Sequence, residues 1–250
     1  MILHRFEPQV EATLLRRYKR YLADFQLPDG TVVTAHCPNP GRMTSVLEAC
    51  GRCYLTPLPR SATRKLDYRW ELAESNGAFV TVNTQLANRA ARTLLENCPE
   101  LQQRLELKEP FRLASEVRVL SKRAGIQTRF DFAFSQGDGT ILYLEVKQVT
   151  LKVRDVQTAA KAAFPDAISL RGHRHLSELT RLRREGVRTA LLYMVGRPDV
   201  EAVRPAHEVD PEYARLFLEA AEAGVTMVAA KLKPCPRFLS FGGWLPVEKG

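Results

Sequence analysis

The sequence predicts an α/β (α+β) protein in two parts, a small β-barrel over residues 1–82 and a mixed sheet with helices over residues 83–250. Three observations support this fold class. Short strand-like runs with turns fill the first part, helical apolar spacing begins near Asn83, and strand and helix patterns then follow one another. The length of 250 residues suits one large domain or two small ones.

The first part contains short strand-like runs separated by turns and loops. Residues 25–34 include Asp29-Gly30, a dipeptide that favours a hairpin turn, and further runs follow at 53–57 and 78–82. The segment 36–43 is rich in proline and glycine and is predicted as a loop. Several short strands joined by loops are typical of a small barrel.

The second part combines helical and strand-like patterns, and Asp138-Gly139 supplies a turn between two of its strands. A three-strand meander followed by a crossover helix to a fourth strand gives a mixed sheet with helices against it. This order is also the core topology of restriction-endonuclease-like folds. The predicted elements are a helix (84–96), strands (114–120, 126–134 and 141–149), an irregular stretch (152–172), a helix (175–184), a strand (189–195), a helix (211–222) and a strand (225–230).

The chain is basic, with 37 Lys and Arg against 28 Asp and Glu, a net charge of +9 and a pI near 9.5. This balance suits a polyanionic partner such as nucleic acid, or less often an acidic membrane, and the alternative is a merely basic protein. No apolar run approaches the length of a membrane span, and the first residues lack the pattern of a signal peptide. We therefore expect a cytoplasmic location and no membrane partner, whereas the oligomeric state is not predicted.

The five cysteines are odd in number and scattered, as expected of reduced thiols in a cytosol. Cys50 and Cys53 have CxxC spacing, but no second CxxC or paired histidine follows at zinc-finger distance. Two ordinary residues on a strand pair are therefore preferred over a zinc or redox site.

Glu145 and Lys147 lie two residues apart in the apolar run 141–149. Because side chains alternate along a strand, both point to one face, where burial of charge is costly unless a partner compensates. Asp131 lies in a similar apolar stretch of the preceding strand. A turn near residues 137–138 brings position 131 opposite position 144 or 145, so the two carboxylates are predicted to converge beside the lysine.

Two carboxylates beside a lysine suit a site for Mg²⁺ or Mn²⁺. Such a metal neutralises phosphate charge and lowers the pKa of a bound water, and Lys147 can orient or deprotonate that water. The predicted reaction is hydrolysis of a phosphodiester bond. The alternative is that Glu145 and Lys147 form a solvated ion pair on an exposed strand face.

Two further carboxylates each have a simpler alternative. Glu116, on the strand before Asp131, is a candidate third metal ligand, and the alternative is an exposed strand residue. Asp166 lies in the turn-like segment 164–167, where capping of the following segment is its simplest role.

Positive charge gathers in two segments. Residues 16–21 combine four cations with two tyrosines, which suits phosphate neutralisation and base stacking. Residues 171–175 lie just before a predicted helix, and the spacing of His173 and His175 favours phosphate contact or capping over metal binding. The alternative for both is a solvated face. The candidate DNA-binding cations are Arg16, Arg17, Lys19, Arg20, Arg42, Lys65 and Arg171, with Arg60 and Arg64 adding charge to the first half.

Several motifs together resemble the sugar fermentation stimulation protein (SfsA) family, in family order and over nearly the whole chain. The loop at 38–41 reads Pro-Asn-Pro-Gly where the family often has Pro-Asn-Thr-Gly, and the segment at 172–175 reads Gly-His-Arg-His where Lys-His is commoner. The matching segments are 16–24 (RRYKRYLAD), 34–43 (TAHCPNPGRM), 82–89 (VNTQLANR), 128–132 (TRFDF), 144–151 (LEVKQVTL), 164–167 (FPDA), 171–179 (RGHRHLSEL) and 210–213 (DPEY).

The resemblance implies an N-terminal OB-like barrel and a C-terminal PD-(D/E)xK restriction-endonuclease-like domain, with the option that the last strands pack back on the barrel. It implies DNA binding, with RNA left open as a partner. By position, Asp131, Glu145 and Lys147 match the nuclease-like motif of the family. The family name comes from an effect on sugar-utilisation genes, so the alternative function is a non-catalytic DNA-binding regulator that retains the nuclease fold.

Overall fold

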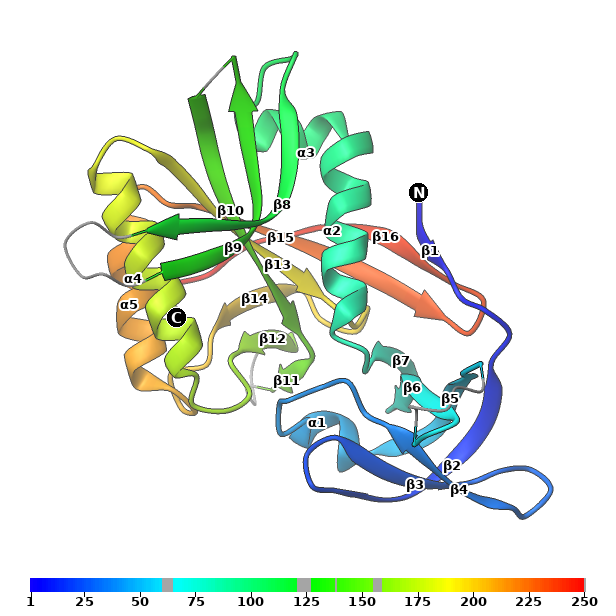
Figure 1. The fold of residues 1–250 in the computed structure, drawn as a ribbon. Coiled ribbons are helices and arrows are strands. Elements are labelled where there is room, and N and C mark those ends of the chain that lie inside the picture. The colour runs from blue at the N-terminus through cyan, green and yellow to red at the C-terminus, as the bar shows by residue number, and fades with distance from the viewer. Residues whose placement is uncertain (60–64, 121–126, 138, 155–158, 250) are drawn as a thin grey trace.

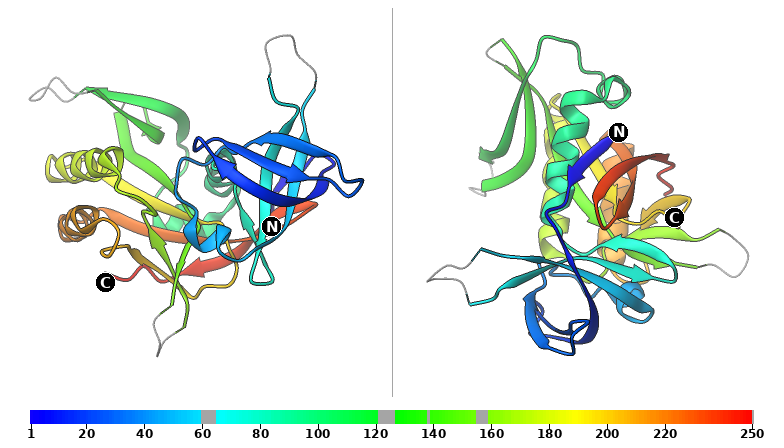
Figure 2. Two further views of the ribbon diagram at one scale, coloured as in Figure 1. Left: turned by 90° about the horizontal axis from the view of Figure 1, so that it is seen from below. Right: turned by 90° about the vertical axis from the view of Figure 1, so that its right-hand side faces the viewer.

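The structure is a computed structural model that describes residues 1–59, 65–120, 127–137, 139–154 and 159–249. Its elements form an N-terminal barrel and a C-terminal mixed sheet covered by helices (Figure 1). The barrel packs against one end of the C-terminal part (Figure 2). Within the described residues, no helix is both long and apolar enough to cross a membrane.

Five strands close the N-terminal barrel. The elements of this part are β2 (Val10–Tyr18), β3 (Leu22–Gln26), β4 (Val32–His36), the short helix α1 (Thr44–Leu47), β5 (Cys50–Pro57), β6 (Tyr68–Ser75) and β7 (Ala78–Thr81). The sheet order is β4-β3-β2-β5-β6-β7, and pairing of β4 with β6 closes it. Gly30, with φ of 88°, lies in the turn between β3 and β4 that Asp29-Gly30 predicts. The buried rings of Phe25 and Trp70 meet edge to face in the barrel core.

The C-terminal part is built on a seven-stranded mixed sheet. In sheet order its strands are β1 (Ile2–Arg5), β16 (Phe238–Leu245), β15 (Thr226–Cys235), β13 (Arg188–Val195), β10 (Gly139–Val149), β9 (Gln127–Gln136) and β8 (Arg112–Leu120). The central strands β10, β13 and β15 are parallel, and the outer pairings are antiparallel. A separate three-stranded sheet contains β11 (Leu151–Val153), β12 (Lys161–Phe164) and β14 (Ala202–Pro205).

Helices cover both faces of the seven-stranded sheet (Figure 1). One face packs on α2 (Gln85–Asn97) and α3 (Pro99–Arg104), and the other on α4 (Leu170–Arg184) and α5 (Pro211–Glu222). Residues of β13 alternate between the two cores, since Leu192 packs on the α2 side and Leu191 on the side of α4 and α5. The neighbouring strand β10, which carries Glu145 and Lys147, is therefore covered on both faces.

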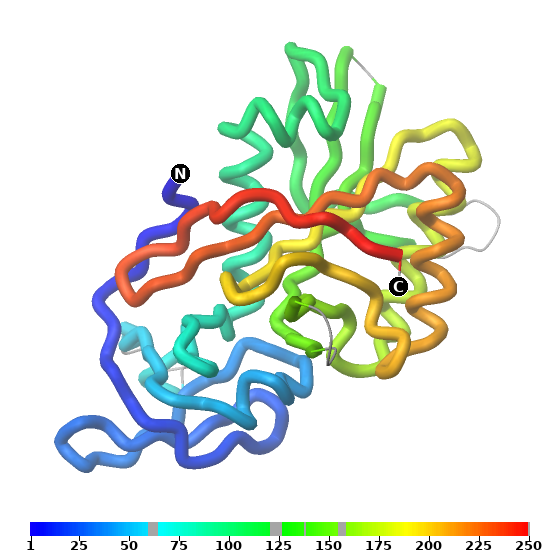
Figure 3. The backbone as a smooth tube through the Cα atoms, turned by 180° about the vertical axis from the view of Figure 1, so that it is seen from behind, coloured from blue at the N-terminus to red at the C-terminus, as the bar shows by residue number. Residues whose placement is uncertain are grey.

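Residues 2–5 lie in the second sheet, although the sequence assigns residues 1–82 to the first domain. They form β1, which pairs antiparallel with β16, and Figure 3 shows the first and last strands of the chain side by side. This pairing joins segments at opposite ends of the sequence, so no local turn signal marks it. The last strands β15 and β16 extend this sheet, and β15 also lies beside β7 of the barrel.

Other boundaries differ from the prediction because of local hydrogen bonds. Helix α4 begins at Leu170, before the predicted residue 175, since the Ser169 hydroxyl caps it by accepting a hydrogen bond from Gly172 N at 3.0 Å. The stretch predicted as irregular contains β11 and β12. The predicted turn residue Asp138 lies outside the described residues.

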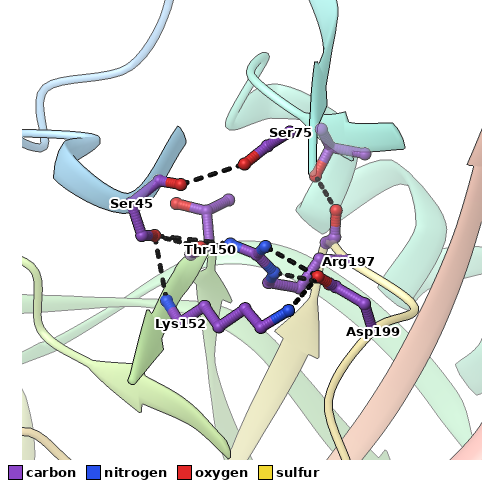
Figure 4. A network of polar contacts seen from close by, with 8 residues as sticks. Ser45, Ser75, Thr150, Lys152, Arg197 and Asp199 are labelled. Atoms are coloured by element: carbon purple, nitrogen blue, oxygen red, sulfur yellow. Dashed lines mark hydrogen bonds and ion pairs between the residues drawn. The ribbon is translucent and has the colours of Figure 1, made fainter. Parts of the chain in front are cut away.

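A buried polar network joins the two parts (Figure 4). The side chain of Arg197 is fully buried and donates to Thr150 O at 2.9 Å and to the Asp199 carboxylate at 2.7 Å. The Ser45 hydroxyl, from α1, accepts a hydrogen bond from Lys152 N at 3.0 Å. We call this contact the domain seam; it comprises residues 38–45 of the barrel and residues 148–152, 166 and 196–199 of the C-terminal part.

Candidate functional site

Asp131 and Glu145 lie opposite each other on neighbouring antiparallel strands. Phe132 of β9 pairs with Leu144 of β10, so the next position along each strand brings Asp131 level with Glu145. The Asp131 Oδ2 atom accepts a hydrogen bond from Val146 N at 2.8 Å. This bond turns the Asp131 carboxylate toward β10, and the two acidic side chains converge.

Two nitrogen atoms converge on one oxygen of Glu145. Lys147 lies on the same face of β10, and its Nζ is 2.5 Å from Glu145 Oε1. His175 of α4 contacts the same oxygen through its Nδ1. The other oxygen, Glu145 Oε2, is buried and has no hydrogen-bond partner among the described residues. One carboxylate therefore has an oxygen with two partners and an oxygen with none.

The pKa values of the two carboxylates are shifted in opposite directions. Burial, and then the negative charge of Glu145, raise the pKa of Asp131 to about 6. Burial also acts to raise the pKa of Glu145, but the Lys147 ammonium and the hydrogen bond from His175 outweigh it, so this pKa lies below its usual range. Burial lowers the pKa of His175, which keeps the ring neutral near pH 7.

Asp131, Glu145 and Lys147 line a pocket between the barrel and the sheet. The pocket has a volume of about 280 Å³, and residues 39–41 of the barrel form one of its walls. Asn88 of α2 lies on another side, where its amide donates to Asp131 Oδ1 at 2.7 Å. Asp166 and Arg171 also line the pocket. Acidic, basic and amide groups from both parts of the chain therefore share one cavity.

The donor set fits a divalent cation. Glu145 Oε2 is a buried oxygen without a partner, and an unpaired buried carboxylate oxygen is costly unless a cation or donor meets it. Burial is the main cause of the raised pKa of Asp131, and the charge of Glu145 adds to it; a cation between the two carboxylates would offset both effects. Oxygen ligands of this kind suit Mg²⁺, Mn²⁺ or Ca²⁺. In the part of the chain that the structure describes, no group of three or more His, Cys, Asp or Glu is placed so that it could hold a metal ion.

Comparison with known proteins gives the family. Residues 15–82 match the SfsA N-terminal OB domain, and residues 85–237 match the sugar fermentation stimulation protein RE domain. This chain belongs to the SfsA family. A sugar fermentation stimulation protein homolog of Pseudomonas syringae pv. tomato is 42% identical over 93% of this chain and 93% of its own length. A homolog of Geotalea daltonii is 37% identical over 98% of this chain and 99% of its own length.

A solved SfsA structure shares the fold. The structure of Pyrococcus furiosus SfsA in complex with Ca²⁺ aligns with a TM-score of 0.82 and 27% identity, covering 99% of each chain. Together with the OB-domain match, this similarity confirms the predicted fold class, an N-terminal OB barrel followed by a C-terminal mixed sheet. It also confirms the family resemblance that the motifs carry.

Glu116 does not line the pocket of this SfsA-family protein. It lies on β8 between the pairs Ser115–Phe132 and Val117–Phe130, so its backbone is level with Asp131. Glu116 has a left-handed φ of 56°, which distorts the strand locally while the one-to-one pairing with β9 continues on either side. The exposed carboxylate forms an ion pair with Arg129 at 2.7 Å. The structure thus brings the Glu116 backbone near the site but turns the side chain elsewhere.

Two of the predicted DNA-binding arginines have protein partners. The exposed Arg16 forms an ion pair with Asp24 at 2.7 Å. Arg17 donates to Asn39 O at 2.7 Å and to the carbonyl of Arg20 at 2.8 Å, and also reaches the carbonyl of Arg42 at 3.2 Å. Arg17 therefore links the pocket loop, residues 39–42, to the β2–β3 hairpin. The run of basic residues in the sequence does not indicate this role.

The remaining predicted cations of the barrel are exposed. Lys19 and Arg20 form the tight turn between β2 and β3, both with left-handed φ. Arg42 lies on the loop beside the pocket, and Lys65 lies at the barrel surface. Arg60 and Arg64 lie outside the described residues.

The basic segment at the start of α4 divides into three different environments. Arg171 lines the pocket, and its Nε donates to His175 Nε2 at 3.4 Å. His173 instead contacts both carboxylate oxygens of Asp210, at 2.8 and 2.9 Å. His175 is buried against Glu145, so the predicted phosphate contact or capping role does not describe it.

Asp166, which lines the pocket, contacts the barrel instead of capping a helix. Its Oδ2 accepts a hydrogen bond from Met43 N at 3.0 Å. Gly41 lies so close to this carboxylate that a Cβ at that position would overlap it. The simple capping role predicted for Asp166 is therefore wrong, because Ser169 provides the cap of α4.

Two residues of the site were not singled out from the sequence as part of it, Asn88 and His175. The only signal for either was its position inside a family segment, 82–89 for Asn88 and 171–179 for His175.

Cys50 and Cys53 lie on one strand, β5, with their sulfur atoms 3.5 Å apart as free thiols, and not on a strand pair.

Proposed function

We propose that this SfsA-family protein binds DNA and hydrolyses phosphodiester bonds with the help of Mg²⁺ or Mn²⁺ held in the pocket at Asp131 and Glu145. The observation that carries the proposal is the buried, partnerless Oε2 of Glu145 beside a second carboxylate with a raised pKa. The solved structure of Pyrococcus furiosus SfsA with Ca²⁺ adds support for a divalent cation in this family.

Each residue has a chemical role in this proposal. Asp131 and Glu145 would hold the cation, which when bound supplies positive charge for the phosphate and lowers the pKa of water. Lys147, whose Nζ lies beside Glu145, is suited to orient or deprotonate the attacking water and to stabilise developing negative charge. Asn88 holds the Asp131 carboxylate in place. Glu116 stays a candidate third ligand, because its backbone is level with Asp131 and its exposed ion pair with Arg129 is readily exchanged.

Cations from both parts of the chain favour a nucleic-acid substrate. Arg171 lines the pocket, and the exposed Arg42 lies on the loop that forms its wall. The exposed Lys19 and Arg20 extend this positive charge along the barrel. Neutralisation of phosphates by such side chains provides affinity that does not depend on base sequence. DNA is the proposed partner, and RNA is tested beside it.

Cleavage of DNA tests the catalytic proposal. Single-stranded and duplex DNA and RNA are incubated with wild-type protein, Asp131→Asn or Asp67→Asn, with Mg²⁺, Mn²⁺ or EDTA. We expect cleavage by wild type and by Asp67→Asn, whose substitution removes an equal charge from the barrel surface, and none by Asp131→Asn or in EDTA. Equal cleavage by wild type and Asp131→Asn would mean that a contaminating nuclease or another site is responsible.

A salt titration tests the binding proposal independently of cleavage. With Asp131→Asn, log K for duplex DNA should fall linearly with log[salt], by about 0.9 per phosphate contact. Lys19→Ala should reduce the slope by about one contact. A slope near zero would contradict phosphate contact by the basic residues.

A non-catalytic DNA-binding regulator is the second candidate function. It is favoured by the position of Lys147 and Glu116, which in this structure are engaged in ion pairs with Glu145 and Arg129. The curated relatives are also named for stimulation of sugar fermentation. Salt-dependent DNA binding by wild type, unchanged in Asp131→Asn and without cleavage of any substrate, would support this function over the nuclease.

A further inference from the structure

We propose that His175 is the positioning residue of the cation site, holding Glu145 Oε1 so that Oε2 stays free for the metal. This inference rests on the proposed function and names a residue of α4 that acts through Glu145. The juxtaposition of the His175 ring, the Glu145 carboxylate and the Arg171 guanidinium carries it.

The two ring nitrogens of His175 have different partners. Nδ1 contacts Glu145 Oε1, and Nε2 accepts a hydrogen bond from Arg171 Nε at 3.4 Å. A neutral imidazole donates from one nitrogen and accepts at the other, so this arrangement assigns the proton to Nδ1. Arg171, which cannot accept, fixes the tautomer in which His175 donates to Glu145.

The position of the ring is fixed by its packing. Only 6% of His175 is exposed, and its ring lies 6.2 Å from that of Phe130 between centroids. The same part of α4 packs into the core through the buried side chains of Leu176 and Leu179. A ring held in this way can fix the carboxylate that it contacts, because little freedom remains to be lost on metal binding.

His175 and Lys147 together explain why the two oxygens of Glu145 differ. The Lys147 Nζ lies 3.2 Å from His175 Nδ1, and both nitrogens converge on Oε1. With Oε1 satisfied by these two groups, the partnerless Oε2 is the oxygen left for a cation. Without the His175 contact, Glu145 can rotate so that both oxygens engage Lys147, and the carboxylate is lost as a ligand.

A direct catalytic role for His175 does not fit this geometry. Both of its nitrogens have protein partners, and the ring is not among the residues that line the pocket of Asp131 and Glu145. His175 borders a neighbouring pocket with Arg129 and Arg174 instead, so it acts on the site of Asp131 through its contact with Glu145. Many metal sites orient a ligand by a hydrogen bond of this kind, and loss of that bond typically weakens metal affinity about 10- to 100-fold.

Mn²⁺ binding to three variants of the full chain, measured by calorimetry, tests the proposal. His175→Asn keeps an N–H donor at the position of Nδ1, whereas His175→Leu removes it and keeps an apolar side chain. We expect His175→Leu to bind Mn²⁺ about 10- to 100-fold more weakly than wild type, and His175→Asn to recover most of the affinity. His173 lies on the same helix as His175 but contacts Asp210 instead of Glu145, so His173→Asn should bind Mn²⁺ as wild type does.

The outcomes separate the two proposals. If wild type binds Mn²⁺ and His175→Leu binds it equally well, the positioning role is wrong and the cation site stands. If both His175 variants lose affinity to the same degree and unfold at lower urea concentration, His175 acts through packing alone and the proposal is overturned. Absence of Mn²⁺ binding by folded wild type overturns the proposed cation site, and this inference with it.

Discussion

The β2–β3 hairpin and the domain seam both concentrate charge, but they differ in how deeply the arginine of the ion pair is buried. On the hairpin, Arg16 is an exposed side chain with 71% of its surface accessible, and it pairs with Asp24. At the seam, Arg197 is completely buried, with the Asp199 carboxylate and the carbonyl of Thr150 as partners. An exposed ion pair contributes little to stability, whereas a buried charge depends on every partner it has.

The comparison indicates which features locate a binding site in a basic protein. The run of cations in residues 16–20 is the most obvious feature of the sequence, yet Arg17 is used to hold the pocket loop. The pocket beside the seam is lined by two cations, Lys147 and Arg171, and its buried Glu145 Oε2 has no partner among the described residues. A buried carboxylate oxygen of this kind, next to a second carboxylate, is therefore a better indicator of a cation site here than the density of positive charge.

The largest expected effect tests the buried arginine. Arg197→Met should lower the free energy of unfolding by about 3–5 kcal/mol, because it breaks the ion pair of a fully buried guanidinium with Asp199 and leaves Thr150 O with the Ser45 hydroxyl as its remaining donor among the described residues. Urea unfolding followed by circular dichroism measures this change. Arg16→Met on the hairpin is the matched control and should unfold close to wild type. Similar effects of the two substitutions would remove the distinction between seam and hairpin.

The second effect concerns the buried carboxylate of the pocket. Because the pKa of Asp131 is raised from 3.8 to about 6, its ionised form disfavours the folded state, and the contribution of Asp131 to stability falls as pH rises through this interval. Asp131→Asn has no such charge, so in EDTA it should be more stable than wild type near pH 8, by at most about 3 kcal/mol. The difference should vanish as the pH falls toward about 4.

Urea unfolding at several pH values measures this difference. Asp67→Asn, at an exposed position of the barrel, should show no gain that depends on pH across the same interval. A lower stability of Asp131→Asn than of wild type at high pH would show that the ionised Asp131 carboxylate does not destabilise the metal-free protein.

The smallest effect tests the contact of the pocket loop with Asp166. In Gly41→Ala the added Cβ would overlap the Asp166 carboxylate, so the loop must shift, at a cost of about 1–3 kcal/mol. DNA cleavage should fall as well, since residues 39–41 form a pocket wall. Gly51→Ala is the control, because its Cβ would have ordinary contacts, the nearest at 3.6 Å from Glu74 Cβ. Equal behaviour of the two variants would show that the loop wall is loosely held.

Local signals predicted much of the fold. The Asp29-Gly30 turn gave the β3–β4 hairpin, and the helix predicted over 211–222 is α5, which starts where the Asp210 side chain accepts a hydrogen bond from Tyr213 N at 3.0 Å. Strand alternation gave the shared face of Glu145 and Lys147. Each of these features depends on residues within a few positions of each other, which is why the sequence alone reveals them.

Features that depend on distant contacts were not predicted. The Glu116 side chain pairs with Arg129 at a residue with left-handed φ, and nothing in the alternation of β8 indicates such a residue there. His175 finds Glu145 only because α4 packs across the sheet. The roles of Arg17 and Asp166 depend on the loop between the two parts. Such contacts arise from tertiary packing, which residue spacing does not encode.

The pairing of β1 with β16 has a consequence for how the barrel is attached. Because β1 belongs to the C-terminal sheet, the barrel is an insertion between β1 and α2, tethered at both of its ends. Two tethers prevent rotation about a single hinge, so the loop over the pocket keeps its place. A fragment starting at residue 83 would lack β1 and leave the backbone groups along one side of β16 open, where another chain could add as a strand. In the full chain the edge of the sheet is instead the four-residue strand β1, and so short an edge offers few backbone groups to another chain.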